Sequence, residues 1–222
     1  MAGKLVWDQS GERLYETGVS QCALYPMVSG AYPKGVAWNG ITAITESPSG
    51  AESTPMYADN IKYLDIVSTE TYAATIEAYM YPDEFKPCNG ESEIADGVVI
   101  GQQNRQKFGL CYKTILGNDT DGEDYGYELH LVYGGLAAPA EEAHNSKNES
   151  PEGMTMSWSV STTPVEVPGK KPTATVTFNS VKVGEKVMKA IEDVVYGSSA
   201  AEARLPLPSE LIELISTAKA AA

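Results

Sequence analysis

The stretch ATIEAYMYPDEF, residues 74–85, decides the fold class because apolar and polar residues alternate along its first eight positions. Every second residue from Ala74 to Met80 is apolar, whereas the residues between them carry hydroxyl groups or a carboxylate. Successive side chains of a β-strand point to opposite faces, so this pattern predicts a half-buried strand whose apolar face lies against a core. The opposite face carries Thr75 and Glu77 without any lysine, and its environment bears on function.

The same period of two recurs in residues 127–133, 154–163 and 173–179. These segments use the valine, threonine and aromatic residues that suit a pleated, half-buried surface. Trp158 alternates in phase with its apolar neighbours, which predicts a core position for its ring. Residues 108–116 are expected to form a further strand.

One segment has the period of a helix instead. Residues 185–197, EKVMKAIEDVVYG, place apolar side chains at the offsets of an amphipathic helix. Gly197 can adopt the left-handed conformation that ends a helix. We therefore expect a mainly β protein with one amphipathic α-helix at about residues 185–196.

Two segments fall outside this pattern. Residues 39–60 are rich in serine, proline, glycine and threonine and predict a long loop, a feature that is usually functional or disordered beyond about 12–15 residues. Residues 198–222 are expected to form a linker and a short C-terminal helix or tail that begins at Pro208. Such a helix needs a surface to dock on, and its candidate docking residues are Leu211, Ile212, Leu214 and Ile215.

The charge and cysteine content of the chain limit the classes of binding partner and the cellular compartment that we expect. The 222 residues include 16 basic and 30 acidic side chains, a net charge of −14, which disfavours binding to nucleic acid. Cys22, Cys88 and Cys111 are an odd number without CxxC spacing, so we expect free thiols in a reducing compartment. No apolar run approaches the ~18 residues that span a bilayer. The first residues do not resemble a signal peptide, so we expect synthesis in a cytoplasm and no membrane partner.

Catalytic and cofactor motifs are missing from the sequence. It has no GxSxG elbow, P-loop or GxGxxG, and neither His130 nor His144 has a neighbour at metal-ligand spacing. We therefore expect no enzymatic activity, no cofactor and no dedicated metal site. The acidic residues 118–124 fail the spacing of an EF-hand loop, although weak calcium binding there stays open.

Two other functions also stay open. Glu77 and Glu128 would form a hydrolase pair if they lay on neighbouring strands. Tyr79 and Tyr81, near an acidic loop, would give a β-sandwich carbohydrate-binding module on a phage or cell surface.

The chain resembles the major tail tube protein of long-tailed bacteriophages. The resemblance runs from about residue 12 to residue 197, ends before residues 198–222, and includes no catalytic signature. The resemblance consists of seven extended stretches and their order along the chain, and the helix that ends in YG follows them. The stretches are GAYPKGVAWNGITAITESPSGAE, YADNIKYL, ATIEAYMYPDEF, IGQQNRQKFGLCYKT, GYELHLVYGGLAAP, MSWSVSTTPVEV and KPTATVTF.

This resemblance implies an antiparallel β-sandwich over residues 1–197 with one flanking α-helix, in a structural virion protein assembled in the bacterial cytoplasm. Six subunits would complete a joint β-barrel in a hexameric ring, and the rings would stack into a tube that conducts DNA during ejection. Its partners would be other copies of itself, the tape measure protein, the tail terminator and the distal tail proteins, and DNA would pass through without being bound.

Polar strand faces are then candidates for the wall of the lumen or for a subunit interface, because a wall without lysine offers DNA phosphates little attraction. The candidate lumen or interface residues are Thr75, Glu77, Glu128, Thr155, Ser157, Ser159, Thr173, Thr175 and Thr177. The predicted loop would bridge adjacent rings, with candidate contacts Ile41, Thr45, Glu46, Glu52, Met56 and Tyr57. The C-terminal helix is expected to dock on an adjacent subunit.

Overall fold

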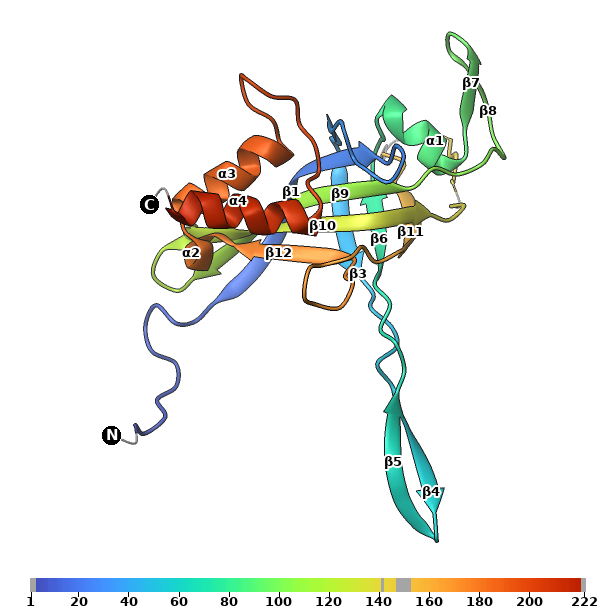
Figure 1. Ribbon diagram of the computed structural model, residues 1–222. Helices are drawn as coiled ribbons and strands as arrows, with labels where there is room; N and C mark the ends of the chain where they lie inside the picture. Colours follow the sequence, from blue (N-terminus) through green and yellow to red (C-terminus); the bar gives the residue numbers. More distant parts are fainter. Residues whose placement is uncertain (1–2, 141, 147–152, 221–222) are drawn as a thin grey trace.

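A computed structural model describes residues 3–140, 142–146 and 153–220 of the chain (Figure 1). Most of its regular structure is strand, as the alternating segments predicted. A short 3₁₀ turn at Asp83–Phe85 precedes the first helix. The strands are β1 (Tyr15–Pro26), β2 (Val36–Ala37), β3 (Ile41–Glu46), β4 (Ser53–Ala58), β5 (Ile61–Val67), β6 (Ala73–Ala78), β7 (Ser92–Ala95), β8 (Val98–Ile100), β9 (Phe108–Asn118), β10 (Gly122–Ala137), β11 (Met156–Thr162) and β12 (Thr175–Asn179), and the helices are α1 (Lys86–Asn89), α2 (Ser180–Val183), α3 (Glu185–Val195) and α4 (Pro208–Ala220).

One antiparallel sheet forms the body, in the order β2-β1-β9-β10-β11-β6-β3, with β12 also paired to β10. The 16-residue β10 pairs with β9 along one edge and with two strands along the other: its middle pairs with β12 and its end with β11. The register shifts between Val132 and Gly135, where Gly134 has a φ of +61°. A β-carbon at Gly134 would lie 2.2 Å from the Thr163 carbonyl oxygen, so this bend requires glycine.

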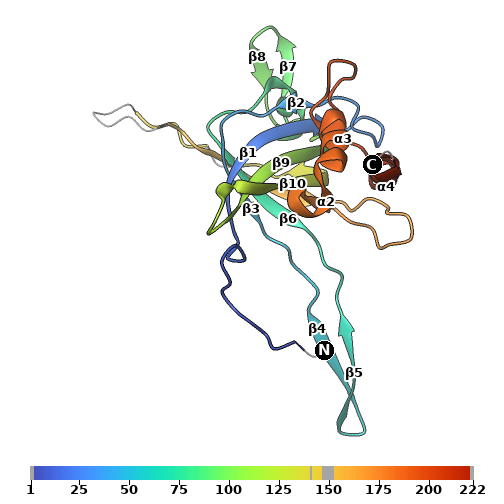
Figure 2. The same cartoon turned by 90° about the vertical axis from the view of Figure 1, so that its left-hand side faces the viewer.

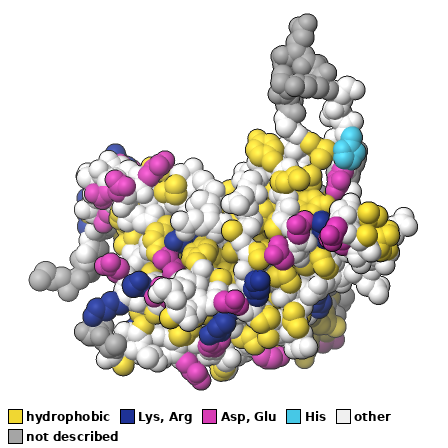
Figure 3. All heavy atoms as spheres, turned by 90° about the horizontal axis from the view of Figure 1, so that it is seen from above, with side chains coloured by type: hydrophobic (Ala, Val, Ile, Leu, Met, Phe, Trp, Pro, Cys, Tyr) yellow, Lys and Arg dark blue, Asp and Glu magenta, His cyan; other side chains and the backbone are white. Residues whose placement is uncertain are grey.

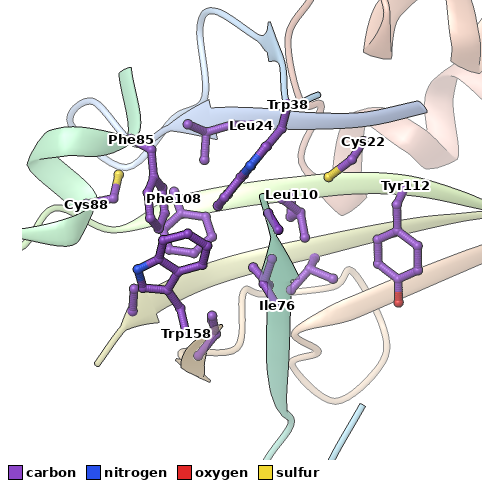
Figure 4. Close-up of a cluster of buried hydrophobic side chains, with 14 of the residues drawn as sticks. Cys22, Leu24, Trp38, Ile76, Phe85, Cys88, Phe108, Leu110, Tyr112 and Trp158 are labelled. Atoms are coloured by element: carbon purple, nitrogen blue, oxygen red, sulfur yellow. The ribbon is translucent and has the colours of Figure 1, made fainter. Parts of the chain in front are cut away.

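The sheet folds over itself into two layers. Strands β3 and β6 run steeply across β1, β9 and β10 (Figures 1 and 2). The first core cluster fills the space between the layers, and the rings of Trp38, Phe108 and Trp158 gather around Phe85 (Figure 4). The Phe85 ring lies 4.5 Å from Trp38, 5.3 Å from Trp158 and 5.5 Å from Phe108, measured between centroids. Trp158 is fully buried, as its phase predicted, and its indole N–H donates to Asn89 Oδ1 at 3.1 Å.

The second core cluster lies on the opposite face of β1, β9 and β10, under helices α3 and α4. Helix α3 buries Val187, Met188, Ile191 and Val195 and ends before Gly197, whose φ is +82°, as the sequence predicted. The Tyr25 hydroxyl donates to the carbonyl of Val195 at 2.7 Å, which fixes the end of α3 on the sheet.

The prediction of a single flanking helix is wrong, because α4 covers the sheet beside α3. Leu211 is 2% exposed within the second core cluster, and Leu214 and Ile215 pack against that cluster. Leu205 pairs with Tyr32, so the segment before α4 is also part of the body. The expected docking surface therefore lies on the chain itself, and among the candidate docking residues only Ile212, 45% exposed, is a large apolar side chain directed to the surface.

The strand predicted from residue 74 ends earlier than expected. Ala74, Ile76 and Ala78 are buried as the alternation required, but Met80 is 64% exposed. Strand β6 ends at Ala78, and the chain then turns into the 3₁₀ segment, which breaks the period of two.

Candidate assembly surfaces

A long hairpin, here called the arm (residues 47–72), projects from the body as a continuation of β3 and β6 (Figures 1 and 2). Backbone hydrogen bonds between Ser49 and Thr71 close its base, with N···O distances of 2.9 and 2.8 Å. Strands β4 and β5 pair at its far end. The arm is therefore an ordered extension of the sheet rather than an irregular loop.

Every residue of the two arm strands is exposed. Several are large and apolar, and the exposed fractions of Tyr57, Ile61 and Tyr63 reach 65–70%. The salt bridge between Lys62 and Asp65 is internal to the arm. An isolated two-stranded hairpin is marginal in water, and an exposed apolar patch of this kind indicates an interaction surface.

The loop predicted over residues 39–60 is thus wrong, because its serine and proline content conceals two strands. The first half is β3 of the body sheet: Ile41 packs on the first core cluster, Thr45 pairs with Thr75, and Glu46 accepts a hydrogen bond from the Tyr112 hydroxyl at 2.6 Å. Among the candidate bridge contacts, the structure places three in the arm: Glu52, Met56 and Tyr57.

A second hairpin, formed by β7 and β8, projects from the opposite end of the body to the arm (Figures 1 and 2). Its turn is Asp96-Gly97, with the Gly97 φ at +74°. Ile94 is 63% exposed, and three further apolar side chains on β8 are 39–48% exposed. Seen from this end, hydrophobic side chains are exposed between single acidic and basic ones (Figure 3). Both ends of the subunit thus present apolar contacts.

The candidate lumen residues fall into two sets on opposite faces of the sheet. In the first set, Thr75 pairs with Ser159 and Glu77 with Ser157 across β6 and β11. The alternate residues on these strands, such as Trp158, are buried in the first core cluster. This set therefore points away from that core, and its row continues to Thr45 on the edge strand β3. Thr155 is exposed just before β11.

The second set lies on the face that bears the first core cluster. Val132 belongs to that cluster and pairs with Thr175, whereas His130 pairs with Thr177. Glu128, two residues before His130, shares this face and accepts a hydrogen bond from the Asn179 amide at 3.0 Å. Thr173 precedes β12, and its hydroxyl donates to the Thr175 carbonyl at 2.9 Å. One wall made from one sheet face cannot contain both sets.

The hypothesised hydrolase pair is not formed. Strand β11 lies between β10 and β6, and Glu128 and Glu77 belong to the two opposite sets. The condition for this pair, that the two strands are neighbours, is therefore not met, since the middle of β10 pairs with β12 and the end of β10 with β11.

The two tyrosines of the hypothesised carbohydrate-binding module do not form a common binding surface either. Tyr79 is 56% exposed, whereas the Tyr81 ring packs edge-on against Trp158 at 5.6 Å. The Tyr81 hydroxyl donates to Glu91 Oε1 at 3.1 Å, and burial beside this carboxylate raises the pKa of Tyr81 to about 12. The two rings therefore do not present one flat surface.

The acidic turn at residues 118–124 holds the N-terminal segment in place. The backbone N–H groups of Gly11 and Arg13 donate to Asp119 Oδ1 at 3.0 and 3.4 Å. Desolvation opposes ionisation, but these hydrogen bonds outweigh it and hold the pKa of Asp119 below its ordinary value. Asp121 accepts from the Asn118 amide at 2.9 Å. Asp119 and Asp121 thus have hydrogen-bonding partners within the chain.

A comparison with models of protein families and a search of curated proteins found no match to this chain. Among the described residues, no helix is both long enough and apolar enough to cross a membrane.

Proposed function

We propose that this chain is a structural, self-assembling subunit that forms the tail tube of a long-tailed bacteriophage. Hexameric rings would stack into a conduit for DNA, within a virion assembled in the host cytoplasm. The observation that carries the proposal is the arm, whose exposed apolar strands extend away from the body. The residue stretches that resemble tail tube proteins support the same conclusion.

The arm is suited to join successive rings. It projects from one end of the subunit while the second hairpin projects from the other, so head-to-tail stacking brings the arm of one ring onto the body of the next. Contact would bury Met56, Tyr57 and the apolar side chains of β5, and each fully buried side chain of this size contributes about 1.5–3 kcal/mol. Glu52 lies beside this patch.

The first polar set is the better lumen wall. It occupies the outer face of β3, β6 and β11, which contain no lysine or arginine. Helices α3 and α4 pack over β1, β9 and β10 instead and would lie outside the tube. Strand β3 ends the sheet, and its free edge is available to a neighbouring subunit, which would satisfy the unpaired backbone groups. Tape measure, terminator and distal tail proteins would contact the lumen and the ends of such a tube.

Electron microscopy of the purified full chain tests the assembly. We expect rings or tubes from the unaltered protein. Replacing residues 50–70 by Asn-Gly retains the paired base of the arm and should leave a folded subunit that no longer stacks. The matched control, Val181→Ser on α2, changes an exposed apolar side chain outside both hairpins and should stack as the unaltered protein does. Unaltered stacking after removal of the arm would refute the bridge, and a monomer that never assembles would refute the tube.

Lysine substitutions test the assignment of the lumen. The double substitution Ser157→Lys and Ser159→Lys would add twelve positive charges to each hexameric ring. Each new contact with a DNA phosphate strengthens DNA binding and makes that binding more dependent on salt concentration. We expect particles built from this variant to release DNA slowly at low salt, with recovery at high salt. Thr177→Lys, on the opposite sheet face, is the control and should release DNA normally. The reverse result would place the second set on the lumen.

A further inference from the structure

A cluster of three metal-ligating side chains lies on the second polar set, outside the proposed assembly contacts. Glu16 on β1 meets Glu128 and His130 on β10, and one ligand atom from each lies within 4.8 Å of the other two. Glu16 Oε1 is 3.6 Å from His130 Nε2. The cluster is formed by the fold, since β9 separates the two strands and Glu16 is more than 110 positions from its partners.

The imidazole is held by groups that leave it in one orientation. Its ring stacks on Tyr112, with centroids 4.6 Å apart and planes 7° from parallel. The Thr177 hydroxyl is 3.4 Å from Nδ1, and the Thr114 hydroxyl is 2.9 Å from Nε2. The His130 side chain is only 12% exposed. Ring orientation by an outer hydrogen bond at the second nitrogen is a feature of histidines that bind metals.

The charge balance of the cluster favours a cation. Two carboxylates share the site with one imidazole, and in the described part of the chain neither Glu16 nor Glu128 forms a salt bridge with lysine or arginine. The nearby Lys113 is directed to the opposite face, where its ammonium lies 2.6 Å from Glu192. Adjacent carboxylates repel each other unless a positive charge lies between them.

We propose that Glu16, Glu128 and His130 bind one divalent transition-metal ion, of which Zn²⁺ is the representative example. One nitrogen and two carboxylate oxygens form a three-ligand set that leaves a fourth position for water. An imidazole ligand favours Zn²⁺ or Co²⁺ over Mg²⁺ and Ca²⁺, which prefer oxygen. Nε2 is the ligand nitrogen, Nδ1–H donates to the Thr177 hydroxyl, and the Thr114 hydroxyl rotates away. The ion would link the start of β1 to the middle of β10.

Metal titration of the reduced, chelator-treated full chain tests the site. We expect one equivalent of Zn²⁺ to bind, with at least ~100-fold weaker binding in His130→Ala and Glu16→Gln. Thr177→Val keeps all three ligands and should weaken binding by about 10-fold, the range for outer-shell changes. His144→Ala removes the other histidine of the chain and should bind as the unaltered protein does. Glu77→Gln is the carboxylate control.

Co²⁺ absorption identifies the ligands independently. We expect weak visible bands without a thiolate charge-transfer band, and no competition from Mg²⁺ or Ca²⁺ at equal concentration. Equal Zn²⁺ affinity in His130→Ala and His144→Ala would overturn the site. A thiolate band would overturn it in favour of the cysteines, and absence of binding at tens of micromolar Zn²⁺ would overturn it outright. Should His130→Ala fail to fold, Thr177→Val and the Co²⁺ spectrum still decide the outcome.

Discussion

Replacing Leu211 with alanine distinguishes a C-terminal helix that belongs to its own subunit from one that docks on a neighbour. Leu211 is 2% exposed and lies on α4 within the second core cluster. Buried leucine-to-alanine changes cost about 2–5 kcal/mol, depending on how far the surroundings collapse. Because α4 lies at the margin of the cluster and can shift toward α3, we expect about 2–3 kcal/mol.

This loss is measurable in the isolated subunit. A domain of this size loses about 2–4 °C in Tm for each kcal/mol, so the melting temperature of Leu211→Ala should fall by roughly 4–12 °C. Ile212→Ala is the matched control on the same helix. Its side chain is 45% exposed, so its stability should stay within about 0.5 kcal/mol of the unaltered protein.

Calorimetry at concentrations where the chain is monomeric makes the comparison. Equal melting temperatures for Leu211→Ala and Ile212→Ala would refute intramolecular docking. If Leu211→Ala then lost only its ability to form rings or tubes, α4 would dock on an adjacent subunit, as the sequence alone suggested.

Three further perturbations test the local physics of the fold. The Arg204 guanidinium holds the pKa of Glu210 below its ordinary value of 4.5, so this pair contributes stability above that pH and loses it as the pH falls through the folded-state pKa. In urea melts, Glu210→Gln should cost under about 1 kcal/mol at pH 7, because the pair is over a third exposed, and less at pH 2; an equal cost at both pH values would contradict the ion pair. Gly134→Ala should be far more destabilising than Gly122→Ala, which has a similar φ of +60° but open space around its β-carbon, and equal losses would show that only the backbone conformation matters. Burial raises the pKa of both Cys88 and Cys111 to about 12, so iodoacetamide at pH 8 should label the thiols only after unfolding, and rapid labelling of the native chain would contradict their burial.

The elements that sequence reasoning predicted are those with one face against a core. Strand β11 alternates strictly between buried Met156, Trp158 and Val160 and exposed serines, and α3 buries one helical stripe. In both, burial imposes the period that the residue pattern reveals. Strand β10 was also predicted, although its partners were not, because the change from β12 to β11 depends on a bend at Gly134.

The strands of the arm were not predicted, because no core imposes an alternation of apolar and polar residues on them. Both of its strands are exposed on each face, so apolar residues follow no alternation. The remaining signal is the turn, where Asp59 and Asn60 have φ values of +50° and +65°, the geometry of a two-residue hairpin. In the second hairpin the turn dipeptide is Asp96-Gly97, in which Gly97 has the positive φ, +74°. Attention to these dipeptides would have identified both projections.

The lumen candidates show why residue chemistry alone could not define a surface. Threonine and serine on β6, β11 and β12 look alike in sequence, yet strand pairing places Ser159 on one face of the sheet and Thr177 on the other. In the second set, the Thr177 hydroxyl lies 3.4 Å from His130 Nδ1 and the Thr173 hydroxyl donates to the Thr175 carbonyl, so these hydroxyls have hydrogen-bonding partners within the subunit. In the part of the chain that the structure describes, the first set has no cluster of metal-ligating side chains, and its row continues to the edge strand β3. A polar face whose side chains have no hydrogen-bonding partner among the described residues, beside the edge strand β3, is the one that an assembly can use.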